Sequence, residues 1–396
     1  MNELDAVLGF AVAFALAVLL TPLAARFAVV IGAVDRPRDR GLATRETPLL
    51  GGLAILAGVL AASALLLNLG GGVGDRMQGI LAGGVLIALV GALDDRFELA
   101  PAVKLLGQIA AAAIPVKAGV EVTNFTLPFL GAVDLGDAGA PLTVLGLVFV
   151  MNVVNFSDGI DGLAAGVCAI SAVAFAVIAF DLERGTAATL AAITAGGATG
   201  FLVHNFPPAR VFMGDCGANL LGLLLGCIAV EGAVKTQAVL ALVFPLVVLA
   251  VPFLDTAFVV LKRVKYKRPV YVADQNHFHH RFDRIGFSRR RTVLYLYAWT
   301  IAVACFAIAL RFVPYSDDGG TLDAGWTIVM VLIGLLVLAA SVYLVYILEI
   351  LKFRRLRESR LRRSRPAVTE REIDRDVEAR METGQFDAIK PEDLVS

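Results

Sequence analysis

Apolar runs of membrane-spanning length alternate with short polar segments along most of the chain. A helix needs about 20 apolar residues to cross a bilayer, because each residue adds about 1.5 Å along the axis. Eleven runs reach or approach that length, so we predict an all-α integral membrane protein with about 11 transmembrane helices. The predicted spans are residues 6–30, 51–69, 77–94, 101–117, 141–156, 162–180, 186–205, 216–231, 236–262, 293–312 and 326–350.

Basic residues are distributed unevenly between the segments that connect these spans. An odd number of spans places the two termini on opposite sides, so the connecting segments form two alternating sets. One set, with its adjoining helix ends, holds 29 of the 35 lysines and arginines, which predicts that it is cytoplasmic. We therefore expect a multi-pass protein of the inner (plasma) membrane, with the N-terminus outside and the C-terminal tail in the cytoplasm. The cytoplasmic set is residues 31–50, 94–100, 157–161, 206–215, 263–292 and the tail from 351.

The pattern divides the chain into a polytopic domain, residues 1–350, and a charged cytoplasmic tail, residues 351–396. The tail begins K-F-R-R-L-R-E-S-R after Leu351, a composition that fits contact with anionic membrane lipids. On the opposite side, residues 120–135 combine partial alternation with turn-forming residues. This stretch predicts a small extracytoplasmic hairpin.

Composition narrows the functional classes. The chain is 58% apolar, above the 45–50% that is typical of soluble domains. Its formal net charge is zero, so no broad basic surface for nucleic acid is indicated. The cysteines have no C-x-x-C spacing, and we interpret them as small apolar residues rather than as a disulfide framework or zinc site. They are Cys168, Cys216, Cys227 and Cys305.

Asp94 and Asp95 directly follow an apolar run. Adjacent carboxylates at the C-terminal end of a helix repel each other and oppose the helix dipole, so a nearby cation or proton would stabilise them. A solvated helix terminus is the simpler alternative. Lys104 follows on the next predicted helix, where it could contact a phosphate or extend toward the membrane surface.

The stretch N-V-V-N-F-S-D-G-I-D-G-L begins at Asn152 and carries two amides and two carboxylates. Asn152 and Asn155 lie three residues apart and therefore share one helix face. Asp158 and Asp161 flank a glycine-containing turn. Mg²⁺ prefers oxygen ligands, commonly one or two carboxylates together with substrate phosphates, and amide oxygens can supplement them. The alternative is that all four are capping and turn residues.

Asp215 stands at the start of a predicted helix, between Gly214 and Gly217. Glycines let a phosphate approach the backbone, and a helix N-terminus favours anions. The aspartate could cap the helix, or it could hold a metal ion that bridges to a phosphate.

The longest predicted cytoplasmic loop contains three of the four histidines of the chain, His277, His279 and His280, followed by Arg281. A zinc site is one interpretation, but no cysteine lies nearby. Histidine donors acting with Arg281 on a pyrophosphate fit the acidic loops better. Carboxylates and amides for a divalent cation, together with basic donors for anions, indicate phosphoryl transfer.

Four motifs together resemble the integral-membrane polyprenyl-phosphate N-acetylhexosamine-1-phosphate transferases. They are D-D-R-F-E-L-A-P, N-V-V-N-F-S-D-G-I-D-G-L, F-M-G-D-C-G and H-F-H-H-R, and the resemblance extends over about residues 10–350. The family implies eleven helices and dependence on Mg²⁺, with Mn²⁺ as an alternative ion. It also implies that a lipid phosphate attacks the sugar-linked phosphate of a UDP-sugar and that UMP leaves.

The resemblance also assigns roles. Asp215 would be the main Mg²⁺ ligand with Asn155 near it, and Asp94 and Asp95 would be the essential catalytic pair. Asp94 would serve as a base, although a phosphomonoester is already mostly dianionic at neutral pH, so organising the cation or the lipid head group is an alternative. Lys104 would contact phosphate. Substrate contacts would come from Asn152, Asp158 and Asp161 at the nucleotide, and from His277, His279, His280 and Arg281 at the sugar phosphate.

The spacing of the histidines resembles the branch that uses N-acetylglucosamine. The implied partners are UDP-N-acetylglucosamine, a polyprenyl phosphate (undecaprenyl or decaprenyl) and membrane lipids, with a homodimer left open. Transfer of phospho-N-acetylmuramoyl-pentapeptide or of another UDP-N-acetylhexosamine is the alternative within the family. A transporter is a more distant one, because transporters concentrate ionisable groups near the membrane midplane, whereas here they gather at helix ends.

Overall fold

The protein is described here from a computed structural model. The structure describes residues 1–35, 46–127, 131–233, 289–313, 323–341 and 343. The predicted span 236–262 and the predicted sites at His277, His279, His280 and Arg281 lie outside these residues.

Helices form at the other ten predicted spans. Eight helices in the described part of the chain are long and apolar enough to cross a membrane, which confirms an all-α multi-pass membrane protein. α2 and α4 are shorter, with 16 and 17 residues. The count of eleven and the membrane orientation stay predictions. The helices are α1 (Glu3–Ile31), α2 (Gly51–Leu66), α3 (Gly71–Phe97), α4 (Pro101–Lys117), α5 (Gly139–Ser157), α6 (Leu163–Asp181), α7 (Gly185–Asn205), α8 (Gly214–Ala233), α12 (Arg289–Phe312) and the helix Ala324–Ser341.

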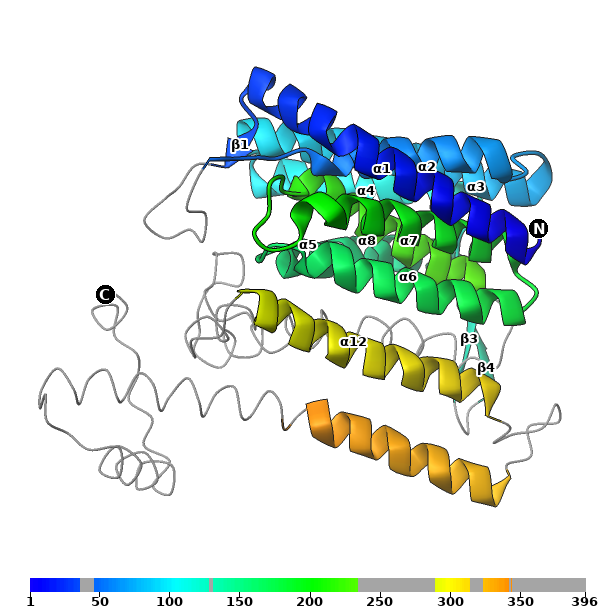
Figure 1. Cartoon of the computed structure of the whole chain (residues 1–396). Helices are drawn as coiled ribbons and strands as arrows, with labels where there is room; N and C mark the ends of the chain where they lie inside the picture. The colour runs from blue at the N-terminus through cyan, green and yellow to red at the C-terminus, as the bar shows by residue number, and fades with distance from the viewer. Residues whose placement is uncertain (36–45, 128–130, 234–288, 314–322, 342, 344–396) are drawn as a thin grey trace, which may run out of the picture.

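The helices lie side by side in a bundle, with the N-terminus at one end and β1 at the other (Figure 1). The predicted hairpin forms as β3 (Asn124–Leu127) paired antiparallel with β4 (Gly131–Asp134), at the same end as the N-terminus. A second, unpredicted hairpin pairs β1 (Val34–Asp35) with β2 (Thr47–Pro48). The shared end of the N-terminus and the β3–β4 hairpin agrees with the parity that the alternating loop sets predict.

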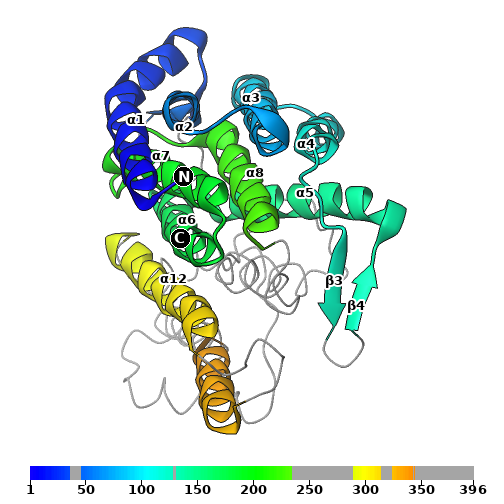
Figure 2. The same cartoon turned by 90° about the vertical axis from the view of Figure 1, so that its right-hand side faces the viewer.

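α8 is the central helix of the bundle and packs against α2, α3, α5, α6 and α7 (Figure 2). Its first turn is crossed closely on two sides. A Cβ on Gly52 of α2 would stand 2.2 Å from the backbone nitrogen of Gly217, and one on Gly91 of α3 would stand 2.5 Å from the backbone of Cys216. Only glycine permits such close backbone contact at these crossings, so they fix the position of the N-terminus of α8.

The segment before α8 is tied to α2 by backbone hydrogen bonds. Phe212 donates to the carbonyl of Pro48, and Gly51 and Gly52 donate to the carbonyls of Phe212 and Met213. The three donor–acceptor distances lie between 2.8 and 3.0 Å. The first turns of α2 and α8 are thereby joined at the end of the bundle that carries β1.

Candidate active site

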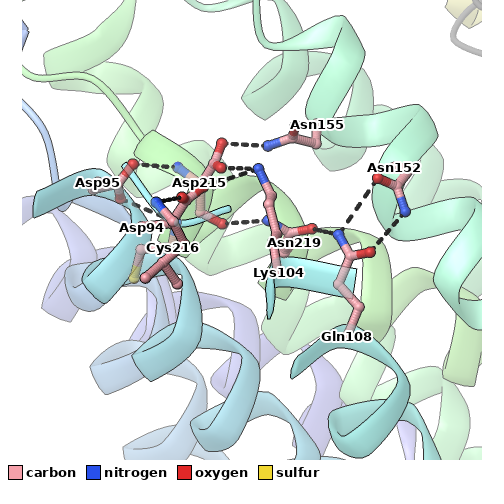
Figure 3. A network of polar contacts seen from close by, with 10 residues as sticks. Asp94, Asp95, Lys104, Gln108, Asn152, Asn155, Asp215, Cys216 and Asn219 are labelled. Carbon is pink, nitrogen blue, oxygen red and sulfur yellow. Dashed lines mark hydrogen bonds and ion pairs between the residues drawn. The ribbon is translucent and has the colours of Figure 1, made fainter. Parts of the chain in front are cut away.

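The polar residues of the candidate site converge at the first turn of α8, where α3, α4 and α5 also end or begin (Figure 3). Asp215 is the second residue of α8 and follows Gly214, whose φ of +69° lies in the left-handed region. A Cβ on Gly214 would stand 2.3 Å from Oδ2 of Asp95. Both the backbone conformation and the space therefore require glycine before Asp215.

Asp95 caps α8 from the neighbouring helix α3. Its Oδ1 accepts from the backbone N–H of Asp215 at 2.8 Å, and its Oδ2 accepts from that of Cys216 at 3.1 Å. A carboxylate at these unpaired N–H groups is stabilised by the positive end of the helix dipole. Asp95 thus performs the capping that sequence reasoning considered for Asp215, and the carboxylate of Asp215 is left for other partners.

Lys104 lies between Asp94 and Asp215. Its Nζ is 3.0 Å from Oδ2 of Asp94 and also forms an ion pair with Oδ2 of Asp215. Asp94 is held in turn by the backbone N–H of Leu99, which donates to its Oδ1 at 2.8 Å. Lys104 therefore points into the site and not toward the membrane surface. The ammonium shows that this position accommodates a cation between two carboxylates.

Amides complete the cluster. Asn155 of α5 donates from Nδ2 to Oδ1 of Asp215 at 2.6 Å. Deeper in the bundle, Gln108 hydrogen-bonds to both Asn152 and Asn219, and we call these three residues the amide layer. Sequence reasoning missed Gln108 and Asn219. Their signal was spacing, because each lies four residues, about one helical turn, after a residue of the charged cluster.

The turn after α5 is tied to the segment before α8. Asp161, 8% exposed, accepts from the backbone N–H of Ala209 at 3.0 Å. Asn205 accepts from Gly162 N–H at 2.8 Å and donates to the Val211 carbonyl at 2.9 Å. Asp161 and Asn205 therefore hold together the two loops that flank the site.

α12 braces the same two loops. Tyr297 donates from its hydroxyl to the carbonyl of Gly162, and Arg290 donates from Nε to the carbonyl of Pro207 at 2.7 Å. The helix that follows the predicted histidine loop thus contacts the loops beside Asp158 and Asp215.

Asp158 lies in this turn, just beyond the end of α5. Burial raises the pKa of Asp158 to about 8, and the negative charges of Asp215, Asp95 and Asp161 add to the effect. The shift indicates that Asp158 experiences the field of the acidic cluster, and it favours a protonated carboxyl at neutral pH.

Within the described residues, no three His, Cys, Asp or Glu side chains form a metal-binding group by themselves. The carboxylates of Asp94 and Asp215 do converge on one cation, the ammonium of Lys104, and the amide of Asn155 hydrogen-bonds to Asp215. This donor set fits Mg²⁺, which is commonly held by one or two carboxylates together with substrate phosphates. Asp95 is a weaker candidate ligand, because both of its oxygens already accept backbone hydrogen bonds.

Comparisons with known proteins show to which family the chain belongs. The model of glycosyl transferase family 4 matches residues 77–233, which include the cluster from Asp94 to Asn219. A probable undecaprenyl-phosphate N-acetylglucosaminyl 1-phosphate transferase of Bacillus subtilis (strain 168) is 36% identical over 77% of this chain and 85% of its own length. The chain belongs to glycosyl transferase family 4. The resemblance predicted from the motifs is thereby confirmed, and the protein is a transferase.

Two further relatives of this family 4 transferase carry different names. A decaprenyl-phosphate N-acetylglucosaminephosphotransferase of Mycolicibacterium smegmatis is 36% identical over 72% of this chain and 77% of its own length. A phospho-N-acetylmuramoyl-pentapeptide-transferase of Desulforudis audaxviator is 33% identical over 68% of this chain and 86% of its own length. The relatives therefore include both activities that the sequence left open.

Proposed function

We propose that the protein transfers N-acetylglucosamine-1-phosphate from UDP-N-acetylglucosamine to a polyprenyl phosphate at the cytoplasmic face of the inner membrane. UMP is released, and the product starts a lipid-linked glycan of the cell envelope. The observation that carries the proposal is the convergence of Asp94, Lys104 and Asp215 at one end of the helix bundle. At a helix end, a lipid phosphate and a water-soluble nucleotide sugar can meet. The names of the Bacillus and mycobacterial relatives support this donor and this acceptor.

In the proposed reaction, an oxygen of the lipid phosphate attacks the phosphorus that bears the sugar. The bond between that phosphorus and the oxygen bridging to UMP breaks, and UMP leaves with the electron pair. The principal requirements are to position two anions and to neutralise their charge. Mg²⁺, or Mn²⁺ in its place, would be held by Asp215 and Asp94 with Asn155 beside them, and it would supply charge neutralisation at the diphosphate.

Lys104 is proposed to exchange its carboxylate partners for substrate phosphate. Its ammonium pairs with Asp94 and Asp215. With Asp94 and Asp215 holding a divalent cation, the ammonium of Lys104 would be free to contact a phosphate oxygen. Asp94 need not act as a base, because a phosphomonoester with a second pKa near 6 is already mostly dianionic at pH 7. We propose that Asp94 orients the lipid head group or the cation.

The nucleotide end of the site is proposed to lie beside the turn after α5. Asp158 is the best placed of the three predicted contacts, since Asn152 already bonds to Gln108 and Asp161 to the backbone of Ala209. These two would act mainly by holding the pocket in shape. The sugar-phosphate contacts of His277, His279, His280 and Arg281 stay predictions from the sequence.

The test is UMP release from UDP-N-acetylglucosamine by the purified protein with polyprenyl phosphate and Mg²⁺, beside controls with EDTA and with Asp215→Asn. We expect release that requires lipid and metal and that falls at least 100-fold in the variant. Turnover only with the UDP-linked MurNAc-pentapeptide would instead support the activity named for the Desulforudis relative. No turnover with any UDP-sugar, by a folded protein, would contradict the proposal.

A further inference from the structure

The amide layer connects three helices through a continuous chain of hydrogen bonds. Asn152 of α5 donates from Nδ2 to Oε1 of Gln108 of α4 at 2.9 Å. Gln108 donates from Nε2 to Oδ1 of Asn219 of α8 at 2.8 Å, and Asn219 donates from Nδ2 to the carbonyl of Asp215 at 2.8 Å (Figure 3). Gln108 and Asn219 are each 1% exposed, so these bonds form away from water.

The amide layer is in register with the charged cluster. On each of α4, α5 and α8, the amide lies one helical turn deeper in the bundle than a residue of the charged cluster, which is either Asp215 or a residue that contacts it. The pairs are Lys104 with Gln108, Asn155 with Asn152, and Asp215 with Asn219. Two polar layers of three residues are thus stacked on the same three helices.

The direction of the bonds makes this layer sensitive to helix position. Gln108 accepts from α5 and donates to α8, so its carboxamide is bonded to both neighbouring helices. If α4 slid or rotated, at least one buried amide would lose its partner, and an unpaired buried polar group is destabilising. The same movement would displace Lys104, which must reach Asp94 and Asp215 together.

We propose that Gln108 is a positioning residue for the reaction and that it acts through Asn152 and Asn219. It holds α4, α5 and α8 in the one register that brings Lys104, Asn155 and Asp215 to the same point. The inference rests on the proposed function for its kinetic consequence and deepens it, because it assigns a role to buried residues that touch neither substrate. A merely structural amide layer would change stability and leave cation binding and turnover unaltered.

The test replaces Gln108 with methionine, which keeps the length of the side chain and removes both hydrogen-bonding groups. We expect the kcat for UMP release to fall about 30- to 100-fold with a KM for UDP-N-acetylglucosamine within threefold of wild type, because sub-ångström misplacement chiefly lowers the rate of the chemical step. We also expect Mn²⁺ binding to the substrate-free protein, measured by electron paramagnetic resonance, to weaken about tenfold.

The matched control is Gln78→Met on α3. Gln78 is exposed, donates to the carbonyl of Leu69 and lies near the start of α3, whereas Asp94 lies near the end of that helix. This variant should keep wild-type kcat and Mn²⁺ affinity. If the amide layer acts as a unit, Gln108→Met combined with Asn219→Leu should lower kcat about as much as either change alone.

The outcomes separate this inference from the proposed function. If the wild type turns over and folded Gln108→Met keeps kcat within twofold with unchanged Mn²⁺ affinity, the inference is wrong and the proposed function stands. If the wild type releases no UMP, the proposed function fails, and the Mn²⁺ titration decides the inference: weaker binding in Gln108→Met supports it, and equal binding or none in the wild type overturns it. Should Gln108→Met fail to fold, Asn152→Leu, at a less buried position, is judged by the same criteria.

Discussion

At the scale of single residues, Lys104 supplies the positive charge that faces the carboxylates of the site. It forms ion pairs with both Asp94 and Asp215, which stand at the ends of two different helices. Removing one partner of a partly buried charge pair costs more than the pair contributes, because the remaining charges stay desolvated. Lys104 therefore has consequences for stability as well as for chemistry.

We predict that Lys104→Met lowers UMP release at least 100-fold and lowers the unfolding temperature in EDTA by several degrees, because two carboxylates lose their counter-ion. Adding Mg²⁺ should recover part of the lost stability, since a divalent cation can replace the ammonium between them. Differential scanning fluorimetry in detergent measures both effects. Lys117→Met at the exposed far end of α4 is the matched control. Equal melting temperatures for Lys104→Met and wild type in EDTA would contradict this account.

Asp158 gives a prediction about pH. Its pKa is raised to about 8 by burial and by neighbouring carboxylates, against about 3.9 in an unfolded chain. Between these values the folded state binds a proton that the unfolded state does not, so this group lowers the free energy of unfolding as pH rises toward 8. Asp158→Asn removes the titration, and it should therefore gain a few degrees of stability over wild type at pH 8.5 and much less at pH 5.

Thermal unfolding of both proteins at the two pH values checks this prediction. Asp137→Asn, an exposed position near the β3–β4 hairpin, should show no such difference. A stabilisation by Asp158→Asn that is the same at both pH values would mean that the carboxyl does not titrate between them.

At the scale of the elements, the sequence predicted where helices form but not how they cross. Apolar runs are read directly from the chain, so α1 to α8 and α12 appear close to their predicted bounds. The Asp95 cap on α8 and the β1–β2 hairpin depend on contacts between distant segments, which periodicity does not encode. Asp94, Lys104, Asn155 and Asp215 were predicted for the site because charged and amide groups at helix ends are conspicuous in an apolar chain.

The crossing of α2 over α8 supplies a prediction at this scale. Gly52→Ala would place a Cβ 2.2 Å from the backbone nitrogen of Gly217, so the two helices must separate. We expect a loss of about 1–3 kcal/mol in the free energy of unfolding and a clear drop in UMP release, since Asp215 lies two residues from the contact. Gly146→Ala on α5, where a Cβ meets nothing within 4 Å, is the control and should be neutral or stabilising. Unfolding in denaturant measures the stability change. An unchanged free energy of unfolding together with intact activity for Gly52→Ala would show that the crossing tolerates the added methyl group.

At the scale of the whole molecule, the site and the β3–β4 hairpin lie at opposite ends of the helices (Figure 1). The positive-inside rule predicts that the site end is cytoplasmic, and a nucleotide sugar is available on that side. The histidine loop, the charged tail over 351–396 and a homodimer interface stay predictions, because they depend on residues or partners beyond the described chain.

Orientation can be tested by cysteine labelling in cells with a membrane-impermeant thiol reagent. The background is Cys305→Ser, because Cys305 is exposed and the other three cysteines are buried. Asp137→Cys, near the hairpin, should be labelled in intact cells, whereas Arg210→Cys, in the segment before α8, should be labelled only after permeabilisation. Because both positions are exposed, a difference between them reports the side of the membrane and not burial. The reverse pattern would place the site outside, where UDP-sugars are absent, and would contradict the proposed reaction together with the predicted topology.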